Sequence, residues 1–133
     1  MTRKADEGKG DAMKFSLPKE SLLEELQLLQ GIVEKRNTMP ILANILMNVS
    51  AADIELTGTD LEVWLRTHIA ADIEKTGAIT VNGKKNFEIV KSLPADQKVE
   101  VELKDETLEI RAGESEFKVL CLAKEDYPQV PDA

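Results

Sequence analysis

The chain has 133 residues, of which 42% are hydrophobic and 32% are charged, so its length and composition predict one globular domain with its own core. The single cysteine excludes an internal disulfide, and no apolar stretch approaches the roughly eighteen residues that a membrane helix needs. The formal net charge of −8 excludes a protein that is basic over its whole surface, although an acidic shell with a basic lining could still contact DNA phosphates.

The chain opens with a polar segment followed by a strand and a helix. Residues 1–12 mix charges with glycine and carry no large apolar side chain beyond the initial methionine, so we expect a disordered leader or extension. Apolar residues then alternate from 13 to 17, which predicts a short strand. Pro18 suits the first position of a helix, and the apolar spacing of residues 22–33 predicts an amphipathic helix with one buried face.

A polar loop at residues 34–38 leads into three expected strands. Odd positions are apolar from 41 to 49, and alternation continues in the segments 54–56 and 61–71. Gly58 interrupts the pattern between two threonines, which predicts a bulge or tight turn that joins two antiparallel strands.

The same order of elements then repeats after a turn at residues 74–77. A strand is expected at 78–81, a helix at 83–93, and strands at 99–103, 108–111 and 115–122. The order of elements predicts the α+β class, with a duplicated β-α-β-β-β unit and helices on one side of antiparallel sheets.

Three carboxylates, Asp53, Asp60 and Glu62, lie in or near the interruption at Gly58 and would suit a metal or an acid–base pair. No nucleophile or metal-ligand spacing accompanies them, and His68 is the sole histidine of the chain. Turn chemistry explains these residues better than a small hydrolase does, so we expect no catalytic residue, no metal and no cofactor.

Four segments in order resemble the family of bacterial sliding clamps, the β subunit of DNA polymerase III. They are residues 13–15 (MKF), 39–46 (MPILANIL), 56–62 (LTGTDLE) and 126–128 (DYP). The resemblance covers residues 13–133 and only the first of the three domains that such a clamp has. It implies the DNA-clamp (processivity) fold, in which two helices pack on antiparallel sheets.

The resemblance also implies a function. The chain would be the amino-terminal domain of a non-enzymatic processivity factor, a head-to-tail homodimeric ring that encircles duplex DNA without reading its sequence. The ring tethers the replicative polymerase in the bacterial cytoplasm, at the nucleoid, and the polymerase and the clamp loader bind to the later domains. No membrane is implied as a partner.

The DNA-binding residues implied by the resemblance are basic. Arg36 in the loop after the first helix and Lys84 at the start of the second match the family positions, with Lys85 and Lys91 as weaker candidates. Many family members have arginine at the position of Lys84, and lysine lacks the bidentate fork of arginine. From spacing alone, Lys84, Glu88 and Lys91 equally suit a solvated helical face.

The implied dimer interface combines the second helix with the last strand. Its residues are Lys85, Ile89, Leu93, Glu114, Glu116, Phe117 and Val119. The apolar members equally suit a core. Glu114 and Glu116 stand where the family often has basic residues, so the partner's charges must differ or these side chains must point elsewhere. The two glutamates and the acidic composition leave an alternative, a stand-alone clamp-like protein-interaction module that does not bind DNA.

Overall fold

The computed structural model describes residues 13–33, 43–59 and 63–127 of the chain. The predictions that concern residues 1–12, Arg36, residues 39–42, residues 60–62 and Pro128 lie outside these ranges. The described strands are β1 (Met13–Pro18), β2 (Asn44–Val49), β3 (Ile54–Thr59), β4 (Trp64–Ile69), β5 (Asp72–Lys75), β6 (Gly77–Asn82), β7 (Lys98–Lys104), β8 (Thr107–Ala112) and β9 (Ser115–Leu120). The helices are α2 (Lys19–Val33) and α3 (Gly83–Ser92), with a short 3-10 turn, η2, at Lys124–Asp126.

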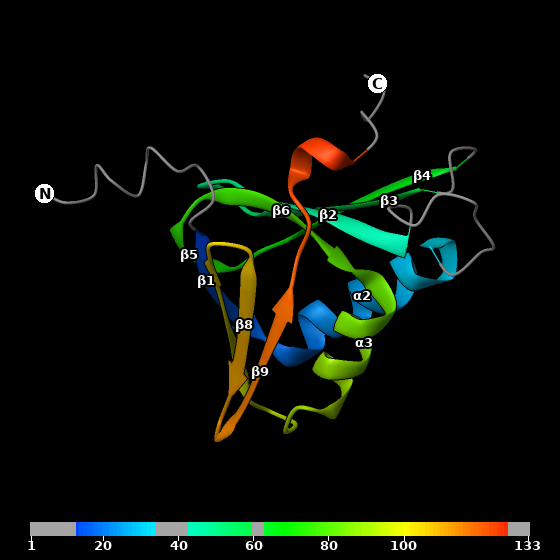
Figure 1. Ribbon diagram of the computed structural model, residues 1–133. Helices are drawn as coiled ribbons and strands as arrows, with labels where there is room; N and C mark the ends of the chain where they lie inside the picture. Colours follow the sequence, from blue (N-terminus) through cyan, green and yellow to red (C-terminus); the bar gives the residue numbers. More distant parts are fainter. Residues whose placement is uncertain (1–12, 34–42, 60–62, 128–133) are drawn as a thin grey trace, which may run out of the picture.

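The strands form two antiparallel sheets against which the two helices pack (Figure 1). The five-stranded sheet has the order β5-β1-β7-β8-β9, and the four-stranded sheet has the order β4-β3-β2-β6. The predicted class, α+β with two helices on antiparallel sheets, is therefore confirmed.

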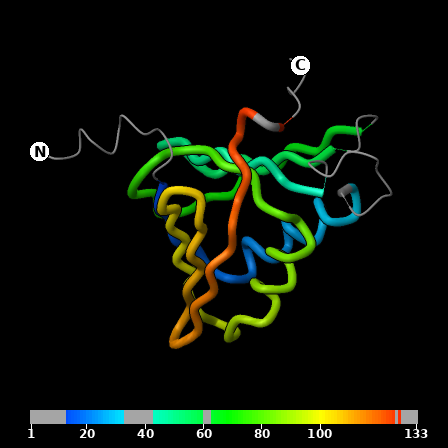
Figure 2. The backbone as a smooth tube through the Cα atoms, in the orientation of Figure 1, coloured from blue at the N-terminus to red at the C-terminus, as the bar shows by residue number. Residues whose placement is uncertain are grey.

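The two halves of the chain interlock by exchanging their first strands. β1 belongs to the first half but pairs with β7, and β6 belongs to the second half but pairs with β2. The exchange continues after the fourth strand of each half. There β5 pairs with β1, and Leu122 pairs with Thr80 of β6 on the path that Figure 2 shows running on from β9. Neither sheet is complete without the other half, so the halves must fold together.

Each helix presents a buried stripe of residues at the spacing i, i+4 and i+7. In α2 these are Leu22, Leu26 and Leu29, and in α3 they are Asn86, Val90 and the capping residue Leu93. Burial of a leucine contributes about 1.5–3 kcal/mol, so the leucine stripe holds α2 against the sheets. The side chain of Asn86 is satisfied by a hydrogen bond from its amide nitrogen to the carbonyl oxygen of Asn82 at 2.9 Å.

Three local predictions were wrong. Gly58 forms no turn: it is buried inside β3 and pairs with Leu65, because the strand continues to Thr59 beside β4. The expected turn at residues 74–77 is largely strand, since β5 finds a partner in β1 that local pattern does not reveal. Pro18 ends β1 instead of beginning the helix, because it still faces Lys98 in the ladder with β7.

Candidate functional site

The start of α3 is fixed by an asparagine cap. Asn82 takes an extended conformation, and its Oδ1 accepts a hydrogen bond from the backbone N–H of Lys85 at 2.8 Å. Such a cap satisfies one of the free N–H groups of the first turn. It therefore sets the place where the helix begins and the directions in which Lys84 and Lys85 leave it.

Three lysines of α3, Lys84, Lys85 and Lys91, are exposed. Lys84 and Lys91 are seven residues apart, which places them on one face with about 10 Å between them along the helix axis. The ammonium of Lys91 lies 5.8 Å from the centre of the Phe87 ring, close enough for a weak cation–π contact. No ion pair among the described residues engages these three lysines, so their charges remain available to an anion.

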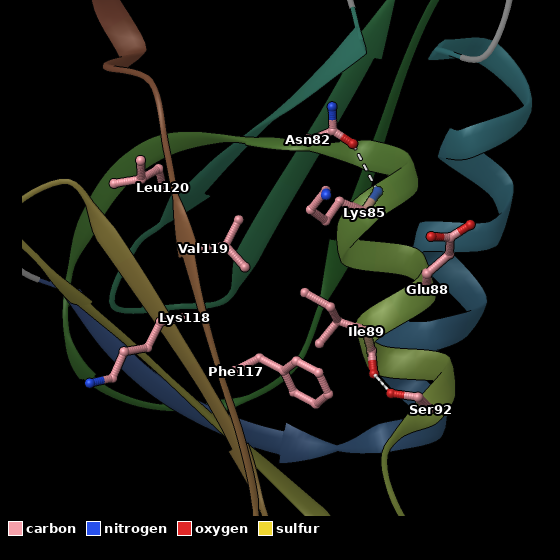
Figure 3. A pocket seen from close by; sticks show the side chains of 9 residues that line it. All are labelled: Asn82, Lys85, Glu88, Ile89, Ser92, Phe117, Lys118, Val119 and Leu120. Carbon is pink, nitrogen blue, oxygen red and sulfur yellow. Dashed lines mark hydrogen bonds between the residues drawn. The ribbon is translucent and has the colours of Figure 1, made fainter.

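A groove of about 790 Å³ separates α3 from β9. It is lined by Asn82, Lys85, Glu88, Ile89, Ser92, Phe117, Lys118, Val119 and Leu120. Figure 3 shows Phe117 and Val119 pointing from β9 toward α3, where Ile89 meets them. Lys118 and Leu120 point to the other side of the strand (Figure 3). Four of the predicted interface residues, Lys85, Ile89, Phe117 and Val119, thus line one groove.

The strand that forms one wall of this groove is an edge strand. Among the described strands, β9 pairs with β8 alone, so its other side presents free N–H and C=O groups. Leu120 on β9 is 79% exposed, although leucine is usually buried. An edge strand with an exposed leucine beside an apolar groove is a surface suited to a further strand.

The remaining predicted interface residues lie elsewhere. Leu93 is 3% exposed and belongs to the core. Glu114 and Glu116 are exposed at the β8–β9 hairpin, which turns at Gly113 with a φ of +60°. The hairpin tip is therefore acidic.

Sequence reasoning missed five groove residues: Asn82, Glu88, Ser92, Lys118 and Leu120. One of them gave a usable signal. In the alternation of the last strand, Leu120 falls on the phase of Glu116 and Lys118, where a polar residue is expected. This apolar residue on a solvent-facing phase is the signal that could have pointed to the edge of β9.

The face of the five-stranded sheet opposite the core carries a charge cluster. The guanidinium of Arg111 lies 2.8 Å from Glu109, 3.3 Å from Glu102 and 3.5 Å from Glu100. Burial acts to lower the pKa of Arg111, but the hydrogen bond to Glu102 and the charges of the three glutamates outweigh it and raise that pKa. This cluster fixes the strand next to β9.

The histidine and the carboxylates near Gly58 form surface pairs. His68 Nδ1 lies 3.1 Å from Asp53 Oδ2, and Arg66 Nε lies 3.2 Å from Glu55 Oε2. Within the described ranges, no group of three or more His, Cys, Asp or Glu side chains is placed to hold a metal. Asp60 and Glu62 lie outside those ranges. None of the described helices is long and apolar enough to cross a membrane.

Two interlocked antiparallel sheets with two helices packed on them define the class of the molecule, an α+β domain of the DNA-clamp type. A solved sliding clamp of Pseudomonas aeruginosa bound to griselimycin has a TM-score of 0.85 and 39% identity, over 92% of this chain and 33% of its own. The sliding clamp of Bacillus subtilis has a TM-score of 0.85 and 30% identity, over 92% of this chain and 34% of its own.

The family model described as "DNA polymerase III beta subunit, N-terminal domain" matches residues 13–131, and the chain belongs to this family. The beta sliding clamps of Pseudomonas aeruginosa and Escherichia coli strain K12 are 40% and 37% identical to it over 121 residues. These matches cover 90% of the chain and 33% of each relative, so the chain spans about one third of their length. The resemblance seen in the sequence is confirmed.

Proposed function

We propose that this domain works as the first part of a DNA polymerase processivity factor, a ring-forming sliding clamp that encircles duplex DNA and tethers the replicative polymerase. The observation that carries the proposal is the groove beside the free edge of β9, on the same helix as the exposed lysines. The relatives named beta sliding clamp support it. The domain itself catalyses no reaction and needs no cofactor. It acts in the cytoplasm, at the nucleoid.

DNA is held by basic side chains that contact phosphates without reading bases. Lys84 and Lys91 of α3 make the main contacts, Lys85 adds a third, and Arg36 is proposed for the same role. The spacing of about 10 Å between Lys84 and Lys91 is large enough for the two ammonium groups to contact different phosphates. Contacts of this kind are weak and screened by salt, so topological closure and not affinity keeps the ring on DNA.

Assembly uses the edge of β9. A strand of a second protomer pairs with the free edge, head to tail, and its apolar side chains enter the groove against Ile89, Phe117 and Val119. The added strand satisfies the free N–H and C=O groups of β9 and covers Leu120. Lys85 lies at the boundary of the lysine face and the groove and contributes to both. Leu93 supports the interface from within the core.

The charges of β9 specify the partner strand. Opposite charges that face each other across neighbouring strands contribute about 0.2–1 kcal/mol, whereas like charges destabilise the pair. The partner strand therefore carries a basic residue opposite Glu116, near Glu114, and an acidic residue opposite Lys118. The clamp loader and the polymerase bind to the remaining domains of the ring.

The alternative is a stand-alone module that binds protein and not DNA. The acidic hairpin tip at Glu114 and Glu116 and the net charge of −8 favour it. A DNA titration separates the two functions. Phosphate contacts by the three lysines of α3 alone predict a slope of about −2.7 in log K against log salt, or about 40-fold weaker binding at 200 mM than at 50 mM, and a contact by Arg36 would make the slope steeper. A protein-binding module would give no salt-dependent DNA binding.

Sedimentation of the chain joined to the remaining two domains tests the assembly surface. Glu116→Lys is expected to raise the dissociation constant of the dimer about tenfold, because the new lysine would face the basic residue proposed on the partner strand. Glu24→Lys on the exposed side of α2 makes the same charge change away from the groove and is expected to leave the dimer intact. Equal effects of the two substitutions would rule out β9 as the assembly edge.

A further inference from the structure

The last turn of α3 ends at one buried residue, Leu93, which lies between the exposed Ser92 and Pro94. Leu93 caps the helix with its backbone N–H bonded to the carbonyl oxygen of Val90 at 3.2 Å, and it is 3% exposed. The last four carbonyl groups of a helix have no partner within it, and a buried end without other partners is destabilised. Groups outside the helix must therefore donate hydrogen bonds to the carbonyl oxygens at this end.

Lys19, the first residue of α2, supplies the hydrogen bonds. Its ammonium donates to the carbonyl oxygen of Leu93 at 2.6 Å and to that of Lys91 at 3.1 Å. The backbone N–H of Lys19 donates to the carbonyl oxygen of Gln97 at 3.2 Å. The residue is 8% exposed, which is rare for a lysine unless its charge is paired or hydrogen-bonded. One residue thus holds both the end of α3 and the turn that follows it.

We propose that Lys19 is a positioning residue for the candidate interface, which holds the last turn of α3 and thereby sets the places of Lys91 and Ile89. An ammonium at the carbonyl end of a helix is stabilised by the helix dipole, and hydrogen bonds to a charged donor are stronger than neutral ones. We call the hydrogen bonds from the ammonium of Lys19 to the end of α3 the anchor. Because one of the acceptors is the carbonyl oxygen of Lys91, the anchor acts directly on a residue proposed to contact DNA.

The same turn forms a wall of the groove. Ser92 lines it, and its hydroxyl donates to the carbonyl oxygen of Ile89 at 2.8 Å. If the ammonium of Lys19 is removed, the carbonyls of Lys91 and Leu93 lose a buried donor, and the turn must open toward water to satisfy them. The effect on DNA rests on the proposed function, whereas the effect on the helix end does not.

The test compares Lys19→Met and Lys19→Arg with Lys98→Met in the 133-residue chain. Lys98 is the matched control, since its ammonium pairs with Asp72 at 3.2 Å between exposed side chains. In Lys19→Met, amide hydrogen exchange in the last turn of α3 and at residues 93–97 should be at least about tenfold faster, with β7 and β8 unchanged. The dissociation constant for DNA should rise about threefold as one phosphate contact weakens. Lys19→Arg should restore both, and Lys98→Met should change neither.

Unchanged exchange at the end of α3 in Lys19→Met would overturn the inference. Faster exchange with unchanged DNA affinity would uphold the anchor and count against DNA binding by Lys91, so the two proposals fail separately. Should Lys19→Met not fold, the unsubstituted chain decides by NMR. A solvent-protected ammonium signal of Lys19, coupled to the carbonyl carbon of Leu93, is expected, and a freely exchanging ammonium would contradict the anchor.

Discussion

Substitution of Arg111 by methionine should destabilise the domain more than the loss of an ordinary surface ion pair. The guanidinium lies 2.8 Å from Glu109, whose side chain is 11% exposed, and 3.3 Å from Glu102, which is 20% exposed. Glu102 and Glu109 face each other directly in the ladder between β7 and β8. Without the arginine, two carboxylates repel across neighbouring strands in a half-buried place.

The magnitude follows from the exposure of the cluster. Removal of one partner of a fully buried pair costs about 3–5 kcal/mol, and an exposed pair contributes about 0–1 kcal/mol. The side chain of Arg111 is 28% exposed, so we expect a loss of about 2–3 kcal/mol in the free energy of unfolding. Lys98→Met removes the exposed pair with Asp72, where the side chains are 59% and 76% exposed, and should cost less than about 1 kcal/mol.

Urea unfolding of the two variants measures this difference. A double variant, Arg111→Met with Glu109→Gln, should recover about 1 kcal/mol, because it removes one of the two carboxylates that face each other, although Lys104 lies 3.7 Å from Glu109 and already offsets part of its charge. Equal stability of the Arg111 and Lys98 variants, or no recovery in the double variant, would refute the reasoning. The cluster would then be solvated like any surface charge.

Three further predictions concern separate parts of the molecule. Gly113→Ala should lower the free energy of unfolding by about 1–2 kcal/mol because Gly113 has a φ of +60°, even though the nearest atoms to an added Cβ are 3.8 Å away. Gly31→Ala on α2 should instead raise the free energy of unfolding by about 0.5–1 kcal/mol, and urea unfolding measures both changes. Burial raises the pKa of Cys121 from 9.0 to about 11 and that of Tyr127 from 10.0 to about 12. Because both groups ionise more readily in the unfolded chain, the stability that their neutral forms contribute is present below pH 9 and is lost as the pH rises from 9 to 12. The loss measured between pH 8 and pH 11 should be smaller in Cys121→Ala, and an equal loss would contradict the burial argument. Lys84→Ala should reduce the slope of log K against log salt for DNA by about 0.9, and an unchanged slope would remove Lys84 from the DNA contact.

The local elements could be predicted from the sequence because their patterns are short-range. Alternation of apolar residues predicted β7, β8 and β9, and the leucine spacing predicted α2 as far as its last residue. The exchange of β1 and β6 between the halves could not be predicted, because pairing between strands distant in the chain leaves no mark on either one. The turn placed at Gly58 was wrong for a related reason, since pairing with Leu65 overrides the local preference of glycine.

The candidate site was predictable in part. The resemblance named Lys85, Ile89, Phe117 and Val119, and these residues do line one groove. Lys19 gave no signal, because a lysine at the start of a helix is ordinary and its acceptors lie 72 and 74 residues further along the chain. Contacts of this range have to be seen in the fold.

The central claim is that this domain belongs to a ring that holds DNA by topology. The most direct test loads the chain, joined to the remaining two domains, onto closed circular DNA and measures retention in high salt before and after the circle is cut. Retention on the circle and loss after cutting is the predicted result, because a ring slides off a free end whatever its affinity for phosphates. Equal retention on circular and linear DNA, or none on either, would contradict the clamp and favour the protein-binding module.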